Sequence, residues 1–175
     1  MQAVAPSHTT LSILRAIARC GFSYAPTKAL AEAAGWRRVD DDPDQGYVRY
    51  DMLMEAETQE WRPLSVMVAE GERPPWAFVT LSYFDEDEAR REPFDAMFQI
   101  PAESLANTLG EASRSGIYTY PHRPDWEYSY AGWTLADFTL ILVQDEFDIQ
   151  FGMDVSLWIL PAGHAVVIPV SEAYE

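Results

Sequence analysis

One short segment of the chain holds the residue types needed for acid–base chemistry. His122 and Asp125 lie three residues apart, and a histidine beside a carboxylate is the minimal equipment for general acid–base catalysis. The same segment, 118–130, also holds the aromatic residues Tyr118, Tyr120 and Trp126. No Gly-x-Ser-x-Gly elbow and no glycine-rich nucleotide-binding loop accompanies them. We therefore interpret 118–130 as an aromatic surface loop, and an enzyme that uses His122 and Asp125 is an alternative.

The patterns that resemble metal sites are incomplete. Four aspartates echo positions 1, 3, 5 and 12 of a calcium-binding loop: Asp40, Asp42, Asp44 and Asp51. Gln45 stands where that loop needs glycine, so a solvated acidic turn is the preferred interpretation. The three histidines, His8, His122 and His164, form no ligand pattern, and Cys20 is the single cysteine. We predict no metal site and no cofactor.

The segment 144–163, QDEFDIQFGMDVSLWILPAG, interleaves carboxylates and large apolar side chains without a single cation. Asp145 and Glu146 are expected in a hairpin turn, where water solvates them. Alternation from residue 149 onward places Asp154 and Trp158 on the polar side of a strand. An outward tryptophan among carboxylates is typical of an interface hot spot, and a tryptophan that covers its own sheet is the alternative. The predicted partner-binding residues are Asp145, Glu146, Asp148, Asp154, Trp158, Trp126 and Trp133.

The charge of the chain narrows the class of partner. The net charge is −16 over 175 residues, and residues 40–175 hold 27 acids against 7 arginines. Such a surface repels nucleic-acid phosphates and anionic membranes, so neither partner is expected. It attracts a basic protein. The cations of residues 1–39 are expected to pair with the chain's own excess acid. A lone cysteine, no signal-peptide pattern and no apolar run of about 20 residues predict a cytoplasmic protein.

These residues must be positioned by a single domain of the α+β class, residues 1–175. We expect a mostly antiparallel sheet of about six strands with about three helices packed on one face. Helices are predicted over 9–21, 25–36 and 101–113, and strands over 47–54, 63–70, 76–84, 138–143, 147–160 and 164–170. Residues 38–46 are predicted as a turn, and 93–100 fits a helix or a strand.

From Phe94 to about residue 160 the chain has a sequence pattern that consists of four parts. Its parts are the helix that ends at Leu109-Gly110, the turn at Gly116, the Tyr130-x-x-Trp133 pair and the acidic hairpin from Gln144 to Gly152. This pattern resembles that of the small cytoplasmic immunity proteins that accompany secreted bacterial toxins. The resemblance implies a non-catalytic inhibitor that occludes or deforms the active site of a toxin.

Charge and resemblance together predict an acidic, non-catalytic immunity protein whose partner is a basic protein, a cognate toxin. An acidic secretion chaperone that holds an extended segment of its client is one alternative, and the small enzyme with His122 and Asp125 is another. The oligomeric state stays open.

Overall fold

The computed structural model describes residues 5–42, 47–53, 61–67, 75–84, 91–148 and 152–168, and it contains three helices within those ranges. The helices are α1 (His8–Arg19), α2 (Tyr24–Ala33) and α3 (Arg91–Leu109). The first two confirm the predicted amphipathic helices. A serine precedes each of them: the Ser7 side chain accepts a hydrogen bond from the Thr10 backbone N–H at 3.1 Å, and Ser23 stands before α2. Gly35, with φ of 71°, follows α2 at the position where glycine relieves a left-handed backbone.

The third helix is longer than the sequence suggested. The ambiguous segment 93–100 is helical and joins the predicted helix that follows it, so that Pro101 lies inside α3. Proline is predicted at the first turn of a helix because it lacks a backbone N–H. Here Phe94, Phe98 and Leu105 are buried on one side of α3, and this packing outweighs the loss of one backbone hydrogen bond at Pro101.

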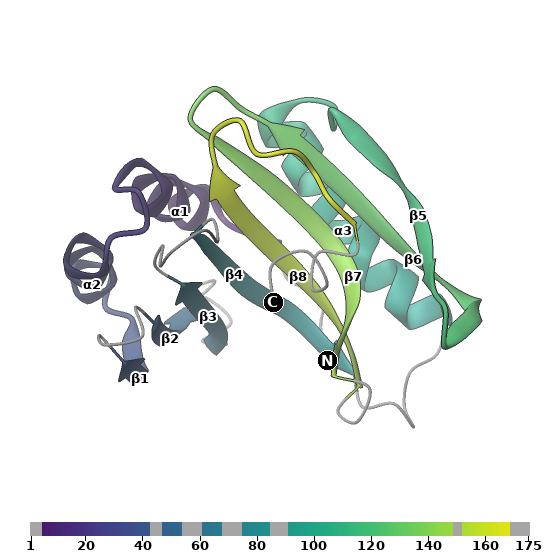
Figure 1. The fold of residues 1–175 in the computed structure, drawn as a ribbon, viewed down its shortest axis with the longest axis horizontal. Coiled ribbons are helices and arrows are strands. Elements are labelled where there is room, and N and C mark those ends of the chain that lie inside the picture. The colour runs from purple at the N-terminus through teal and green to yellow at the C-terminus, as the bar shows by residue number, and fades with distance from the viewer. Residues whose placement is uncertain are drawn as a thin grey trace.

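Within the same ranges, eight antiparallel strands form one sheet. They are β1 (Arg37–Asp42), β2 (Tyr47–Leu53), β3 (Trp61–Met67), β4 (Trp76–Phe84), β5 (Arg114–Tyr120), β6 (Arg123–Thr134), β7 (Phe138–Asp148) and β8 (Gly152–Pro161). Their order across the sheet is β1-β2-β3-β4-β8-β7-β6-β5. The chain therefore makes two meanders: α3 carries it from β4 to the far edge, and β5 to β8 return toward the centre (Figure 1).

The α+β class and the antiparallel sheet agree with the sequence, but three strands were not predicted. Of the turn predicted over 38–46, residues 38–42 belong to β1, and residues 43–46 lie outside the described residues. The predicted loop 118–130 is mostly β-structure, because β5 and β6 form a hairpin that turns at residues 121–122. Conversely, the strand predicted over 164–170 is wrong for residues 164–168, which are irregular, and residues 169–170 lie outside the described residues.

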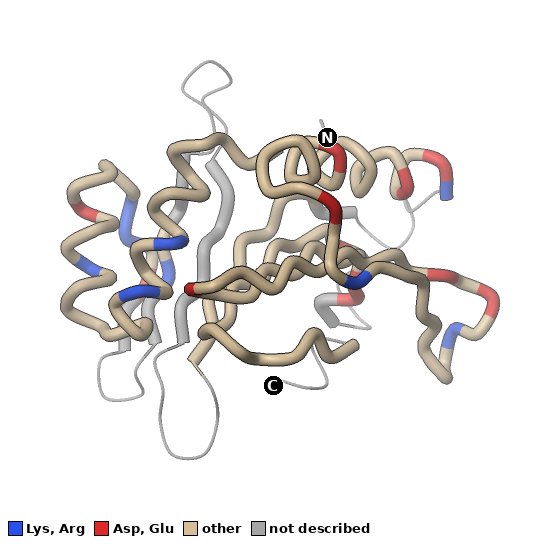
Figure 2. Tube along the Cα trace, turned by 90° about the horizontal axis from the view of Figure 1, so that it is seen from above, with Lys and Arg blue, Asp and Glu red and all other residues tan. Residues whose placement is uncertain are grey.

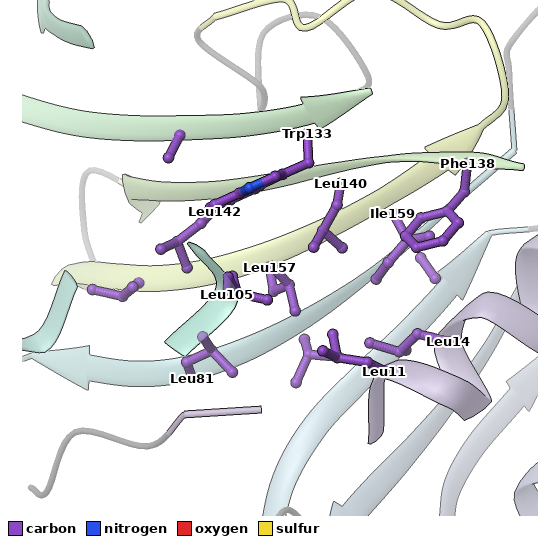
Figure 3. Close-up of a cluster of buried hydrophobic side chains, with 14 of the residues drawn as sticks. Leu11, Leu14, Leu81, Leu105, Trp133, Phe138, Leu140, Leu142, Leu157 and Ile159 are labelled. Atoms are coloured by element: carbon purple, nitrogen blue, oxygen red, sulfur yellow. The ribbon is translucent and has the colours of Figure 1, made fainter. Parts of the chain in front are cut away.

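The helices cover one face of the sheet, where the larger core lies. Leucines of α1 and α3 meet apolar side chains of the three central strands β4, β8 and β7 (Figure 3). The labelled members are Leu11, Leu14, Leu81, Leu105, Trp133, Phe138, Leu140, Leu142, Leu157 and Ile159. All ten are at most 9 % exposed, so this layer carries most of the apolar burial that stabilises the fold.

A smaller core lies on the opposite face, beneath the segment 162–168. Trp76, Trp158 and Val166 belong to it. Gly132 allows the segment to approach, because a Cβ at that position would lie 2.6 Å from Cγ2 of Val166. The Arg114 guanidinium also donates a hydrogen bond to the Val166 carbonyl at 3.0 Å. Residues 162–168 thus cover the sheet instead of joining it as a strand.

Candidate functional site

The acidic residues of the predicted hairpin are buried in strands. β7 continues to Asp148, so Asp145 and Glu146 lie within that strand, and their predicted solvation in a turn is wrong. Asp145 is 3 % exposed, Glu146 8 % and Asp154 2 %. The strand pairing explains the difference, because β7 and β8 are central in the sheet and have neighbours on both sides. The side chain of Asp148 lies outside the described residues.

Two of these carboxylates face each other. Asp145 and Asp154 are directly opposite in the β7–β8 ladder, so their side chains lie on the same face of the sheet. Tyr120 donates its hydroxyl hydrogen bond to Asp145, whereas Oδ1 of Asp154 has no partner among the described residues. Burial and the charge of Asp145 raise the pKa of Asp154 well above its usual value, although a hydrogen bond from Ser156 acts in the opposite direction.

Glu146 is the centre of a second set of contacts. Its carboxylate accepts the Tyr128 hydroxyl, lies 2.6 Å from Nε2 of His122 and lies 3.2 Å from Nε of Arg123. Burial and the hydrogen bond to Glu146 raise the pKa of Tyr128. These contacts connect the β5–β6 hairpin to β7, and they explain how a carboxylate is stabilised inside the sheet.

Gln144 extends the same network to the helix layer. Its side-chain oxygen accepts the Ser129 backbone N–H at 2.7 Å, and its amide donates to the Phe94 carbonyl in α3 at 3.0 Å. The Tyr118 hydroxyl donates to the Gln144 backbone carbonyl at 2.5 Å, and burial raises the pKa of Tyr118. The network therefore connects four elements, β5, β6, β7 and α3.

His122 does have a carboxylate partner, but it is Glu146 and not Asp125. Asp125 is exposed on β6, so the predicted pair does not describe the geometry. The His122 ring also stacks on Tyr120, with centroids 5.2 Å apart. The cleft between α3 and the β5–β6 hairpin, given below, does not include His122. The contacts of His122 position a strand hairpin.

The predicted tryptophans are also packed within the chain. Trp158 is 5 % exposed and stacks on Phe78 at 4.9 Å, so it covers its own sheet, as the alternative interpretation held. Trp133 is 2 % exposed and donates its indole N–H to the Gly110 carbonyl at 2.9 Å. Trp126 is half-buried, and its ring lies 6.1 Å from that of Phe94. None of these three rings projects freely from the described surface.

The aspartates of the calcium-like pattern lie along strands. Asp40 is in β1 and Asp51 is in β2, where it pairs with Arg37 of β1 in the backbone register. Asp44 lies outside the described residues. Within the described part of the chain, no three His, Cys, Asp or Glu side chains are grouped closely enough to hold a metal ion.

A cleft lies between α3 and the β5–β6 hairpin, and Trp133 is the one predicted partner-binding residue that lines it. Its volume is about 460 Å³. Its lining comes from α3, β5, β6 and the α3–β5 connection: Phe98, Gln99, Ala102, Glu103, Ala106, Ala112, Ser115, Gly116, Ile117, Ser129, Tyr130, Ala131 and Trp133. Glu103 is the one charged residue among them. The cleft exists because small side chains of α3 and β6, such as Ala102 and Ala131, leave the space between the two layers unfilled.

Charge is distributed unevenly over the described surface. Figure 2 shows Lys and Arg concentrated on α1 and α2, and acids along α3 and the β5–β6 hairpin. Arg15 and Arg19 both contact Asp137, at 3.0 and 2.9 Å, in agreement with the prediction that N-terminal cations pair with the chain's own acids. The exposed acids at the opposite end are Glu92, Glu103, Glu111, Asp125 and Glu127.

Among the described residues, three arginines lie at the acidic end, and each contacts a group other than these five carboxylates. Arg91 contacts Asp95 at 2.8 Å and donates to the Glu127 carbonyl oxygen. Arg114 and Arg123 are held by the Val166 carbonyl and Glu146, respectively. Among the described residues, the acidic end therefore combines a cleft with more carboxylates than arginines.

Comparison with protein families, with curated proteins and with solved structures finds no match to this chain. No helix in the described part of the chain is long and apolar enough to cross a membrane.

Proposed function

We propose that this chain is an acidic, non-catalytic binding protein that inhibits a basic protein, as an immunity protein does with its cognate toxin. The observation that carries the proposal is the cleft between α3 and the β5–β6 hairpin. Its one charged lining residue is Glu103, and four further exposed carboxylates lie on α3, on β6 and on the connection between α3 and β5. A negative field of this kind accelerates encounter with a basic surface and favours binding in one orientation.

The proposed interface differs from the one that the sequence suggested. Asp145, Glu146, Asp154 and Trp158 are buried, so contact with a partner is not assigned to them, whereas Trp133 lines the cleft. Contact is assigned to the exposed acids of α3 and β6 and to the cleft beside them. Inhibition by occlusion needs only that this end of the molecule covers the active site of the toxin.

The network around Glu146 suits such an inhibitor. Because the network fixes the β5–β6 hairpin to β7 and α3, the cleft walls are held in place before binding. A preformed interface loses less conformational entropy on association than a flexible one.

The test begins with capture of a stoichiometric partner by the tagged protein in cells of the source organism. The partner is then expressed alone and together with the wild-type protein. We expect the partner to arrest growth alone and co-expression to restore it. A partner whose expression leaves growth unchanged, or whose toxicity persists on co-expression, contradicts the proposed function.

A charge reversal supplies the matched comparison. Glu103→Lys changes the charge of the cleft, and Glu32→Lys makes the same change at an exposed position of α2, at the other end of the molecule. We expect Glu103→Lys to weaken rescue of growth and Glu32→Lys to leave it intact. Binding of the partner only in an unfolded form would instead support the secretion chaperone.

A further inference from the structure

We propose that β5 and the cleft beside it bind an extended, basic segment of the partner, which adds to the sheet as a ninth strand. This inference rests on the proposed function and names the form in which the partner is recognised. Three features of the acidic end carry it: an unprotected sheet edge, an apolar cleft below that edge and a carboxylate in the cleft.

β5 is the last strand in the sheet, so one side of its backbone has no strand neighbour among the described residues. Residues 114–117 are all exposed, and Ile117 is 61 % exposed, the most exposed of the large apolar side chains in the described chain. An edge strand presents a row of backbone N–H and C=O groups that can pair with another chain. Residues 114–118 pair in regular register with β6, so their outer side presents a straight template.

The two edges of the sheet are unlike each other. β1, the opposite edge, has the sequence RRVDDD and a register shift between Arg38 and Asp40. Charged side chains and irregular pairing are the features by which proteins prevent association at an edge. β5 has the sequence RSGIYTY, with no lysine, proline or acid. Its one cation, Arg114, donates to the Val166 carbonyl at 3.0 Å. The register shift of β5 lies near its end, between Tyr118 and Tyr120, so residues 114–118 lack both the irregular pairing and the acids found at β1.

The cleft provides sites for the side chains of an added strand. α3 packs over β6 and β7, which leaves the outermost strand uncovered by a helix. Phe98, Ala102 and Ile117 give the cleft an apolar lining, and Glu103 adds a carboxylate to the α3 wall. Successive side chains of a strand point to opposite faces, so every second residue of the bound segment enters the cleft. The five residues of regular edge correspond to a segment of about 17 Å.

Charge selects this occupant over a second copy of the chain. Pairing of two β5 edges would bring together two acidic ends, each with Glu103, Glu111, Asp125 and Glu127 exposed. A segment that alternates lysine or arginine with valine or isoleucine instead matches both the carboxylate and the apolar lining. The chemistry of the cleft therefore indicates a cationic, β-branched strand.

The first experiment uses a defined probe, an acetylated and amidated peptide of three Lys-Val repeats, titrated into the ¹⁵N-labelled full chain. We expect amide chemical-shift changes at residues 114–118 and in the part of α3 that lines the cleft. The control peptide, three Glu-Val repeats, should leave these resonances unchanged. Absence of changes at 114–118 at millimolar peptide, equal changes with the control, or self-association of the chain through β5 would each overturn the inference.

Two variants make the assignment specific. Glu103→Lys and Ile117→Thr alter exposed side chains, so neither removes core contacts, and each is expected to weaken the Lys-Val peptide about five- to tenfold. Glu32→Lys, at the other end, should bind the peptide as the wild-type chain does. Unchanged affinity in both cleft variants overturns the inference.

Its failure and that of the proposed function are distinguishable. If the captured toxin binds both cleft variants as tightly as wild type, the inhibitory function stands and the edge-strand site is wrong. If the Lys-Val peptide binds the cleft but the captured partner is not a growth inhibitor, the site stands and the inhibitory function is wrong.

Discussion

The substitution Asp154→Asn removes the charge of one member of a buried pair of facing carboxylates. Asp154 is 2 % exposed and faces Asp145 across the β7–β8 ladder. Its Oδ1 has no hydrogen-bond partner among the described residues. Asparagine has nearly the same shape, carries no charge and can donate a hydrogen bond to Asp145. We therefore expect the variant to be more stable than the wild-type protein near neutral pH.

The sign and size of the effect follow from proton linkage. Burial and Asp145 raise the pKa of Asp154 above its usual 3.8. Between the usual and the raised pKa, the folded protein holds a proton that the unfolded chain has lost. The contribution of Asp154 to stability therefore falls as pH rises through this window, by up to about 1.4 kcal/mol per pH unit. Below the window both states are protonated, and above it the difference is constant.

Urea unfolding followed by tryptophan fluorescence, at half-unit steps from pH 4 to pH 8, measures this directly. The free-energy difference between Asp154→Asn and wild type should grow with pH and then level off. Asp125→Asn is the matched control, because Asp125 is exposed on β6, and its curve should run parallel to that of wild type. An advantage of Asp154→Asn that is independent of pH, or a variant less stable than wild type throughout, would refute the account of the carboxylate pair.

Three further predictions concern the network and the packing. Glu146→Ala should lower the free energy of unfolding by about 3 to 5 kcal/mol in urea, because it leaves Tyr128 and Arg123 without their buried acceptor. Glu146→Gln, which keeps an acceptor for Tyr128, should lower it less. Gly132→Ala should cost about 1 to 3 kcal/mol, because the new methyl group overlaps Val166, and a Val166→Ala background should reduce that cost in a double-mutant cycle. Trp133→Ala should cost about 3 to 5 kcal/mol by calorimetry or urea, because the indole is buried and bonded to the Gly110 carbonyl.

The first half of the fold was predictable from local patterns. Apolar spacing and a following glycine mark α1 and α2, and short runs of apolar and aromatic residues separated by turn residues mark β2, β3 and β4 as a meander. These signals lie within a few residues of one another, so sequence alone contains them. The extension of α3 through Pro101 was missed, because the local rule for proline is weaker than the burial of Phe94 and Phe98.

The β5–β6 hairpin was missed because prolines and exposed polar residues make 118–130 look like a loop. In the edge strand β5, only the last residue, Tyr120, is buried. β5 therefore has little of the apolar alternation that predicts a strand. Tyr118, Tyr120 and Tyr128 were therefore expected at the surface, whereas the last two are buried. The frequency of tyrosine within this segment was the signal that could have indicated strands, because tyrosine is enriched in strands.

The burial of the acidic residues depends on contacts that sequence order conceals. Tyr120 is 25 residues from Asp145, and Tyr128 is 18 residues from Glu146. Without the strand pairing that unites them, carboxylates in QDEFD are assigned to a turn by default. The cleft beside Glu103 was hidden for the same reason, since its walls come from α3 and from two strands not predicted at all.

The most direct test of the central claim is the dissociation constant of the captured partner for wild-type protein, Glu103→Lys and Glu32→Lys, measured by calorimetry at low and physiological salt. An acidic cleft that binds a basic partner predicts 1:1 binding that weakens with salt, at least fivefold weaker binding by Glu103→Lys, and no change in Glu32→Lys. Binding that is insensitive to salt and equal for all three proteins would contradict the account.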